Sequence, residues 1–421
     1  MKRLLMMALC LSCWATAAVS AEPVDTSTYE LQKAMPVFYR QLKQQLTYPL
    51  AWGHEGAPRR FGAWKRRGRA AVWASMQNVQ PRAADYGLAV LAREQREGYV
   101  ALRIEFNVNA WSRVPAYLLV PDVAAASFPV GASGASPASG KAAAVPRHPA
   151  VLMLHDHGAH VLIGKEKCVR PFACPDTIAR NAQQWIDGGF DGRFFGDYLA
   201  AHGYVVLAVD ALLWGERTVQ PVDKKGRPRR LERQELYDTQ QALAANFLQM
   251  GSSWSAYITA DDVYSAEFLA SLPCVDGARV GTYGWSMGAY RSWMASALSD
   301  AVAASANVCW MSDTEHLMTL DNNQNKGGSA YAMLIPGLRR YMDYPHVASL
   351  ACPKPTLFFN GTRDKLFPTD GVEAAYAEMR RVWHDRAADD RLVTCLWDEA
   401  HHVNLDQQQA ILDFFDRWLK P

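Results

Sequence analysis

The sequence predicts an α/β fold in which a mostly parallel central sheet carries helices on both faces, with a helical extension at the N-terminus. Two observations predict it. Beyond residue 148, short apolar runs alternate with segments of helical periodicity, which is typical of a parallel sheet covered on both faces. Before that point, residues 27–48 and 59–77 have the periodicity of helices.

The composition is that of a globular protein of enzyme size. Of the 421 residues, 49% are apolar and 20% are charged, with 44 basic and 42 acidic side chains. Two of the basic residues, Lys2 and Arg3, lie in the first 21 positions, so 42 of each sign remain when that segment is set aside. Because this balance is neutral, we expect no nucleic-acid partner and no attraction to an anionic membrane.

The first 21 residues have the features of a cleaved signal peptide. Lys2 and Arg3 precede an almost wholly apolar stretch, residues 4–19, and Val19-Ser20-Ala21 is the small-residue pattern that signal peptidase cleaves. A membrane anchor is the alternative, but these 16 residues are fewer than the roughly 20 that span a bilayer. We therefore expect a periplasmic or secreted protein that begins at Glu22 and has no membrane partner after cleavage.

The chain after the signal peptide is predicted to have two parts. Residues 22–84 form the helical extension, and residues 85–421 form the main domain. Residues 123–147 are mostly Ala, Gly, Ser and Pro, which predicts a flexible low-complexity insert in that domain. Residues 84–120 contain apolar or alternating runs split by turn residues, and they predict a strand meander at 90–92, 99–106 and 114–120.

The elements of the main sheet follow in order. Six short apolar runs predict buried strands at 150–154, 205–209, 279–283, 303–309, 356–359 and 392–396. Helical patterns separate or follow them at 193–202, 235–248, 260–271, 288–298, 371–384 and 405–419. The long segment 211–258 has room for a cap.

Six cysteines remain after the signal peptide, and export would place them in an oxidising compartment. An oxidising compartment permits disulfides, and Cys168 and Cys174 flank Pro171 in a loop, which predicts a local bridge between them. No pair has the C-x-x-C spacing of a metal site. We expect neither a metal nor a cofactor.

The sharpest motif is Gly284-Trp285-Ser286-Met287-Gly288, which lies between a predicted strand and a predicted helix. This is the context of a nucleophile elbow, in which flanking glycines let neighbouring backbone approach a serine on a tight turn. The motif predicts Ser286 as a nucleophile. A serine needs a base to take its proton, and the base needs a carboxylate to orient it.

The acid and the base are expected after later strands, in the order serine, acid, histidine. Asp364 follows the strand at 356–359, and Lys365 to Pro368 form a turn that would fix its carboxylate at the edge of the sheet. His401 and His402 follow the last strand and precede the last helix. Position in the chain does not choose between these two histidines.

An oxyanion hole completes the predicted machinery. One donor is the backbone N–H of Met287, the residue after the nucleophile. The second is expected from Gly158 or Ala159, in the loop after the strand at 150–154. The His157-Gly158 pair resembles the oxyanion loop of lipases and esterases.

The same loop has an alternative interpretation. His155, His157 and His160 resemble the metal cluster of metallo-β-lactamase-like hydrolases, although Ala159 stands where that pattern has Asp. A metal site would also leave the serine motif unexplained. The following Gly164-Lys165-Glu166-Lys167 is not a phosphate loop, because it lacks the upstream glycine and the final Ser or Thr.

Taken together, residues 85–420 resemble the α/β-hydrolase superfamily, in the branch of dienelactone hydrolase-like and acetyl xylan esterase-like proteins. The resemblance implies an α/β-hydrolase catalytic domain with Ser286, Asp364 and His401 as its triad. It favours His401 because Asn404 follows three positions later, as in that branch. The motifs that carry it are His155 to Gly158, Gly192 to Asp197, Val209 to Ala211 with Trp214-Gly215, Gly284 to Arg291, Asn360-Gly361 and Asp364 to Pro368.

Dienelactone hydrolase itself has a cysteine nucleophile, and the serine found here favours a carboxylic ester as substrate. We therefore expect an exported serine hydrolase that works through an acyl-enzyme on a small-molecule or carbohydrate ester, with a carbohydrate acetyl ester as the leading candidate. The alternatives are a serine peptidase of the same fold and a metallohydrolase that uses His155, His157 and His160.

Overall fold

The computed structural model describes residues 38–128, 146–158, 160–227, 229, 231–319 and 327–421. The predicted signal peptide and most of the 123–147 insert lie outside these residues. The chain divides into an N-terminal unit that ends at Gln44 and a main unit, Gln45–Pro421. The N-terminal unit contributes one short helix, α1 (Tyr39–Gln44), so the described part of the predicted 27–48 helix is helical over six residues only.

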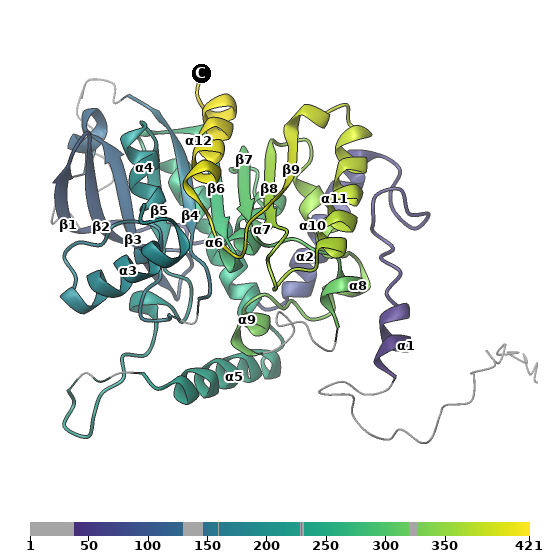
Figure 1. Ribbon diagram of the computed structural model, residues 1–421, viewed down its shortest axis with the longest axis horizontal. Coiled ribbons are helices and arrows are strands. Elements are labelled where there is room, and N and C mark those ends of the chain that lie inside the picture. Colours follow the sequence, from purple (N-terminus) through teal and green to yellow (C-terminus); the bar gives the residue numbers. More distant parts are fainter. Residues whose placement is uncertain (1–37, 129–145, 159, 228, 230, 320–326) are drawn as a thin grey trace, which may run out of the picture. The chain divides into compact units, whose positions relative to one another are not determined.

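A single mixed sheet organises the main unit (Figure 1). Its strand order is β1-β2-β3-β5-β4-β6-β7-β8-β9. The pairs β1–β2, β2–β3 and β3–β5 are antiparallel, and every later pair is parallel. The strands are β1 (Ala89–Arg96), β2 (Tyr99–Asn107), β3 (Arg113–Pro121), β4 (His148–Leu154), β5 (Val205–Val209), β6 (Val275–Trp285), β7 (Ala304–Val308), β8 (Thr356–Gly361) and β9 (Leu392–Trp397). Every strand that the sequence predicted is present, which confirms the predicted fold class.

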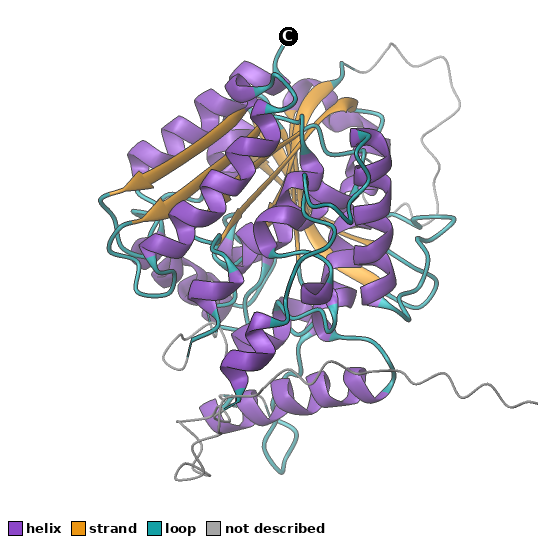
Figure 2. Ribbon diagram, turned by 90° about the vertical axis from the view of Figure 1, so that its right-hand side faces the viewer, coloured by secondary structure: helices purple, strands orange, loops and turns teal. Residues whose placement is uncertain are grey.

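Helices cover both faces of the sheet, as Figure 2 shows for the main unit. Side chains alternate along each strand, so Val151 and Met153 of β4 enter one core while Leu152 and Leu154 enter another. The first face is covered by α3 (Asp176–Gly189), α4 (Phe195–Ala201) and α12 (Leu405–Leu419). The second face is covered by α2 (Phe61–Met76), α6 (Trp254–Ser271), α7 (Met287–Leu298), α10 (Tyr344–Ala348) and α11 (Thr369–His384).

The sequence did not predict α3. Its apolar residues lie on one side of the helix, but only Ala182, Ile186 and Gly189 are buried, and two of these are small. The helix nevertheless places Trp185 beside the end of β4, where the side chain donates a hydrogen bond to Asp156.

The segment between β5 and α6 contains α5 (Arg233–Gln249), which lies apart from the sheet in Figure 1. Its Gln240 is fully buried and contacts His157, just beyond the end of β4. The helix therefore stands at the carboxyl edge of the parallel strands. Two further short helices, α8 (Thr314–Leu317) and α9 (Gly327–Ala332), follow β7.

The predicted Cys168–Cys174 disulfide is wrong. Both residues are free thiols, as are the other four cysteines of the described chain. Cys168 points into the core between α3, α4 and the sheet, whereas Cys174 lines a separate cavity near Tyr117. Spacing alone predicted proximity, but the chain turns the two side chains into different environments.

Among the residues that the structure describes, no helix combines the length and the apolar character needed to cross a bilayer.

Candidate active site

Ser286 stands on a sharp turn between β6 and α7. Its backbone has φ 56° and ψ −127°, a conformation that non-glycine residues rarely adopt. The turn is held because the N–H of Ser286 donates to the carbonyl oxygen of Val308 in the next strand, at 2.8 Å. This strand-to-helix turn with a strained serine is the geometry of a nucleophile elbow.

Both glycines of the motif are required by contacts of the backbone. A Cβ atom at Gly284 would overlap the carbonyl oxygen of Gly288, and a Cβ atom at Gly288 would overlap the carbonyl oxygen of Leu154. The first turn of α7 is therefore packed directly against the end of β4. The sequence motif reflects a steric requirement on two sides of the serine.

Ser286, His401 and Asp364 form a continuous chain of hydrogen bonds. Nε2 of His401 lies 2.8 Å from Oγ of Ser286, and Nδ1 of His401 lies 2.7 Å from Oδ2 of Asp364. The carboxylate side chain is fully buried, and the imidazole is 22% exposed. The structure thus brings together three side chains that the sequence singled out in three distant segments.

His402 has a different environment. Its Nε2 lies 2.8 Å from Oδ1 of Asp191, and the other oxygen of that carboxylate accepts a hydrogen bond from the N–H of Leu405. Asn404 is the N-cap of α12, where its side chain accepts from the N–H of Gln407 at 2.8 Å. Asn404, three positions after His401, therefore caps the helix that follows the histidine.

The surroundings of His401 favour its protonated form. Burial opposes the charge, but the hydrogen bond to Asp364, contact with the thiol of Cys309 and the negative charge of Asp364 outweigh it and raise the pKa of His401 to about 10. The ring also packs against Trp285, with centroids 5.0 Å apart. An imidazolium is the form that a general base takes once it has received a proton from serine.

One predicted oxyanion donor, Met287, lies at the turn, and another, Gly158, lies in the loop after β4. Met287 is the first residue of α7, so its N–H has no partner within the helix and lies at the positive end of the helix dipole. Gly158, at φ +53°, follows the end of β4, against which the first turn of α7 packs. Ala159 lies outside the described residues.

The three histidines of the alternative metal interpretation do not share a site. Nδ1 of His155 lies 2.8 Å from the carbonyl oxygen of Asp156, and Nε2 accepts a hydrogen bond from the N–H of Ala211. Nδ1 of His160 bonds to Asn181, and Nε2 of His157 contacts Gln240. Both ring nitrogens of His155 are thus engaged by the backbone, which does not fit a metal ligand.

Electrostatics agree with these contacts. Burial, Arg291 and Lys167 lower the pKa of His155, and burial and Lys167 lower the pKa of His157 to about 3. Both environments therefore favour the neutral form of the ring. Within the described residues, the one set of three or more His, Cys or carboxylate groups whose ligand atoms all lie within 4.8 Å of one another is Cys309, Asp364 and His401, which does not include these histidines.

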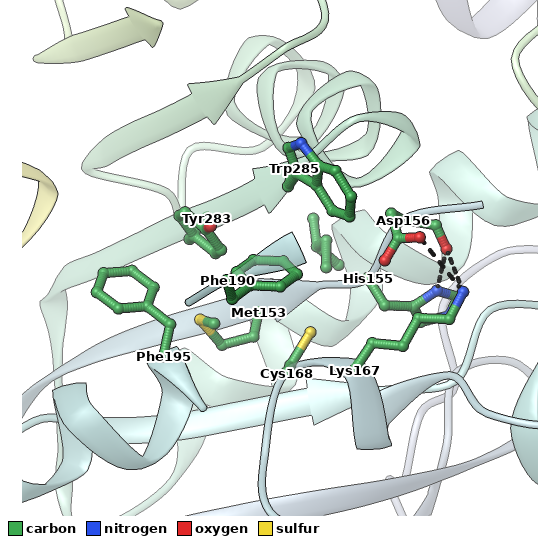
Figure 3. A pocket seen from close by; sticks show the side chains of 10 residues that line it. Met153, His155, Asp156, Lys167, Cys168, Phe190, Phe195, Tyr283 and Trp285 are labelled. Atoms are coloured by element: carbon green, nitrogen blue, oxygen red, sulfur yellow. Dashed lines mark hydrogen bonds and ion pairs between the residues drawn. The ribbon is translucent and has the colours of Figure 1, made fainter. Parts of the chain in front are cut away.

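Sequence reasoning missed the buried charges behind this site. Lys165, Lys167 and Arg291 are each at most 1% exposed, and they lie in the segments 164–167 and 284–291. Lys167 also lines a small pocket with Trp285 beside the elbow, shown in Figure 3. No feature of the sequence distinguishes these three residues from charged residues on the surface.

The chain is similar in sequence to one enzyme family and to one protein described as a putative hydrolase. Residues 244–421, which include Ser286, Asp364 and His401, match the model of the prolyl oligopeptidase family. The protein named "Putative hydrolase YtaP", of Bacillus subtilis (strain 168), is 23% identical over 326 residues, which are 77% of this chain and 90% of that protein.

Solved structures resemble this chain over a larger share of its length. One described as a putative acetyl xylan esterase from Bacteroides fragilis NCTC 9343 has a TM-score of 0.61 and 16% identity, over 85% of this chain and 82% of that one. A glucuronoyl esterase from Solibacter usitatus has a TM-score of 0.53 and 12% identity, over 84% of this chain and 93% of that one. At these identities the likeness is one of fold.

Proposed function

We propose that this chain, which has the α/β-hydrolase fold, is a serine hydrolase that cleaves carboxylic esters through an acyl-enzyme. The observation that carries the proposal is the chain of hydrogen bonds from Ser286 through His401 to Asp364, built on a strained turn. A serine with a base at 2.8 Å, itself oriented by a buried carboxylate, has the contacts that nucleophilic catalysis requires.

The proposed reaction has two halves. In the first, Oγ of Ser286 bonds to the carbonyl carbon of the ester while its proton passes to Nε2 of His401. The carbonyl oxygen becomes an anion, which the N–H groups of Met287 and Gly158 would stabilise. The tetrahedral intermediate collapses, the bond to the alcohol oxygen breaks, and His401 returns the proton to the leaving alcohol.

In the second half, His401 takes a proton from water, and the resulting oxygen nucleophile attacks the acyl group on Ser286. Collapse of the second intermediate releases the carboxylic acid and restores the serine hydroxyl with the proton held by His401. The carboxylate of Asp364 stabilises the imidazolium that forms in each half.

The proposed substrate is the ester of a carbohydrate, with an acetyl group as the leading candidate. The support is the resemblance in fold to a protein described as a putative acetyl xylan esterase and to a glucuronoyl esterase. Aromatic side chains near the base are consistent with it, because Trp285 packs on His401 and Trp185 packs on Trp285 with centroids 5.9 Å apart.

A serine peptidase is the second candidate, and the match of residues 244–421 to the prolyl oligopeptidase family favours it. The two candidates share the triad and differ in the leaving group, an alcohol or an amine. A comparison of matched ester and amide substrates therefore separates them.

The proposal includes export to the periplasm or beyond, because the first 21 residues have the charged, apolar and small-residue regions of a signal peptide. N-terminal sequencing of the protein recovered from a periplasmic or culture fraction tests it. We expect Glu22 as the first residue, and a protein that starts at Met1 in the cytoplasm would contradict export.

The experiment for the enzymatic proposal is a substrate panel on the purified protein: p-nitrophenyl acetate and butyrate, acetylated xylan and aminoacyl-naphthylamides. We expect hydrolysis of the esters and labelling by a fluorophosphonate probe that maps to Ser286. Ser286→Ala is the matched control, expected to lose both. An unlabelled wild-type protein whose ester hydrolysis survives Ser286→Ala would overturn the proposal, and preferential hydrolysis of the amides would favour the peptidase.

A further inference from the structure

Two lysines lie two positions apart in the core of the protein, after β4. Lys165 and Lys167 are 0% and 1% exposed. A lysine is almost never fully buried unless partners satisfy its charge. The partners differ between the two residues, and that difference separates their roles.

Lys165 is bonded to carboxylates. Its Nζ lies 2.8 Å from Asp210, 2.8 Å from Glu166 and 2.7 Å from Glu216. These ion pairs tie the loop after β4 to the loop after β5. These three carboxylates satisfy the buried charge of Lys165, so its burial requires no role in the active site.

Lys167 is bonded mainly to backbone. Its Nζ donates to the carbonyl oxygen of Asp156 at 3.1 Å and to that of His157 at 3.0 Å, and it lies 3.4 Å from Oδ2 of Asp156. An ammonium group has three donors, and all three are directed at two consecutive residues of the candidate oxyanion loop. Figure 3 shows Lys167 beside Asp156 and His155 at the edge of the pocket.

Other buried donors reinforce this arrangement. Nη1 of Arg291 donates to the carbonyl oxygen of His155 at 3.1 Å, and Nε1 of Trp214 donates to that of His157 at 3.0 Å. Three consecutive carbonyl groups, those of residues 155, 156 and 157, thus accept hydrogen bonds from side chains that are buried. Nε1 of Trp185 holds the second oxygen of Asp156 at 3.1 Å.

The consequence for the backbone follows from peptide geometry. In a trans peptide unit the C=O and N–H bonds point in opposite directions. The carbonyl of His157 and the N–H of Gly158 belong to one unit, so fixing the carbonyl toward Lys167 fixes the N–H away from it. The loop runs beside the elbow, because the first turn of α7 touches the carbonyl of Leu154.

We propose that Lys167 is a positioning residue of the oxyanion hole: its ammonium group holds the peptide unit between His157 and Gly158 so that the Gly158 N–H is presented to the oxyanion. The inference rests on the proposed function. It adds a role for a side chain that touches no substrate and acts through the backbone.

The central test compares Lys167→Met with Lys354→Met. Lys354 is the matched control because its Nζ also bonds two carbonyl oxygens, those of Ser296 and Ser299, but at the end of α7 away from the elbow. We expect Lys167→Met to lower kcat roughly 10²-fold with KM little changed, as when one oxyanion donor is lost. Lys354→Met is expected to leave kcat unchanged. Equal losses in the two variants would overturn the proposal.

A second variant tests whether Lys167 positions the backbone or only neutralises the charge of Asp156. It also provides a test if Lys167→Met folds poorly. Lys167→Met combined with Asp156→Asn removes the buried charge pair as a whole, so the folded state should recover. We expect kcat to remain low in this double variant while its melting temperature approaches that of the wild type. Recovery of kcat together with stability would show that Lys167 only neutralises Asp156, and would overturn the proposal.

Binding of phenylboronic acid gives a readout that a structural role would not move. Oγ of Ser286 bonds to boron while its proton passes to His401, and boron becomes a tetrahedral anion that resembles the oxyanion intermediate. We expect its inhibition constant in Lys167→Met to rise by the same factor as kcat falls. An unchanged constant would overturn the proposal, whereas a wild-type protein that neither binds the boronic acid nor hydrolyses esters would overturn the proposed function itself.

Discussion

Nε2 of His401 lies 2.8 Å from Oγ of Ser286, although 115 positions separate the two residues in the sequence. The contact depends on the sheet, because β6 delivers the serine and the loop after β9 delivers the histidine to the same edge. His402 is one position further along and is turned toward Asp191 instead. A shift of one residue thus separates two very different surroundings.

The first prediction concerns these two histidines. His401→Ala should lower kcat by roughly 10⁴-fold or more, nearly as much as Ser286→Ala, because members of a triad act as a unit. His402→Ala should keep a substantial fraction of activity, since its partner Asp191 belongs to the loop after α3. Steady-state kinetics on p-nitrophenyl acetate measure both. An active His401→Ala beside an inactive His402→Ala would show that the assignment is wrong by one residue.

The second prediction is the pH dependence of activity. The base works only when neutral, and the raised pKa of His401 means that it becomes protonated at a higher pH than an ordinary histidine. Activity should therefore fall as the pH falls through this raised pKa, so the acid limb of kcat/KM should lie above pH 6.5.

Asp364→Asn provides the check on this cause. Without the carboxylate, the remaining activity should have its acid limb closer to the ordinary histidine value. Asp191→Asn, which alters the partner of His402, should leave the limb where it is in the wild type. A limb that moves in Asp191→Asn and stays fixed in Asp364→Asn would contradict the assignment.

The third prediction tests the steric origin of the glycine motif. Gly288→Ala should abolish fluorophosphonate labelling and lower the melting temperature, because its Cβ would overlap the carbonyl oxygen of Leu154. Gly188→Ala is the control, since Gly188 lies in α3 with no atom within 4 Å of an added Cβ. There the substitution should be neutral or stabilising by up to about 1 kcal/mol. Similar melting temperatures for the two variants would refute the argument.

The fourth prediction concerns the buried ion pair behind the elbow. Arg291 donates two hydrogen bonds to Asp262, at 2.9 and 2.7 Å, and both side chains are 1% exposed. Arg291→Met should cost about 3–5 kcal/mol of unfolding free energy, because it leaves a buried carboxylate without a partner. Arg279→Met breaks a half-exposed pair with Asp276 and should cost at most about 1 kcal/mol. Urea unfolding of the three proteins measures the difference, and equal costs would count against it.

The fifth prediction follows from the free thiols. Alkylation of the unfolded protein without reductant, followed by peptide mapping, should find both Cys168 and Cys174 modified. Recovery of the two peptides joined by a disulfide would contradict the structure at this loop.

The strands were the most predictable part of the fold. Buried parallel strands such as β5 (Val205–Val209) are continuous apolar runs, and a run of that kind between helical segments has few other interpretations. The helix α3 was not predicted although one side of it is apolar; only three of its residues are buried, and two of these, Ala182 and Gly189, are small. Its position depends on contacts that Trp185 makes with Asp156 and Trp285, which are distant in the sequence.

The candidate site likewise has a part that the sequence predicts and a part that it does not. Ser286 and its glycines could be predicted because their constraint is local, one turn between a strand and a helix. His401 could be distinguished from His402 only through a resemblance, since which ring faces the serine depends on the path of the chain after β9. Lys167 and Arg291 could not be assigned at all, because nothing in a sequence says which charged side chains end up inside.

The buried charge pairs also affect how the protein unfolds. Arg291 with Asp262 and Lys165 with Asp210 join segments 29 and 45 positions apart, and Lys167 with Asp156 closes the loop after β4. If a local opening exposed one partner of a pair to water, the other partner would remain as an unpaired charge in the protein interior. Burial of an isolated charge has a high free-energy cost. We therefore expect partial opening of the buried segments beside the elbow to be rare, so that their amide hydrogens exchange more slowly than those of the exposed loops.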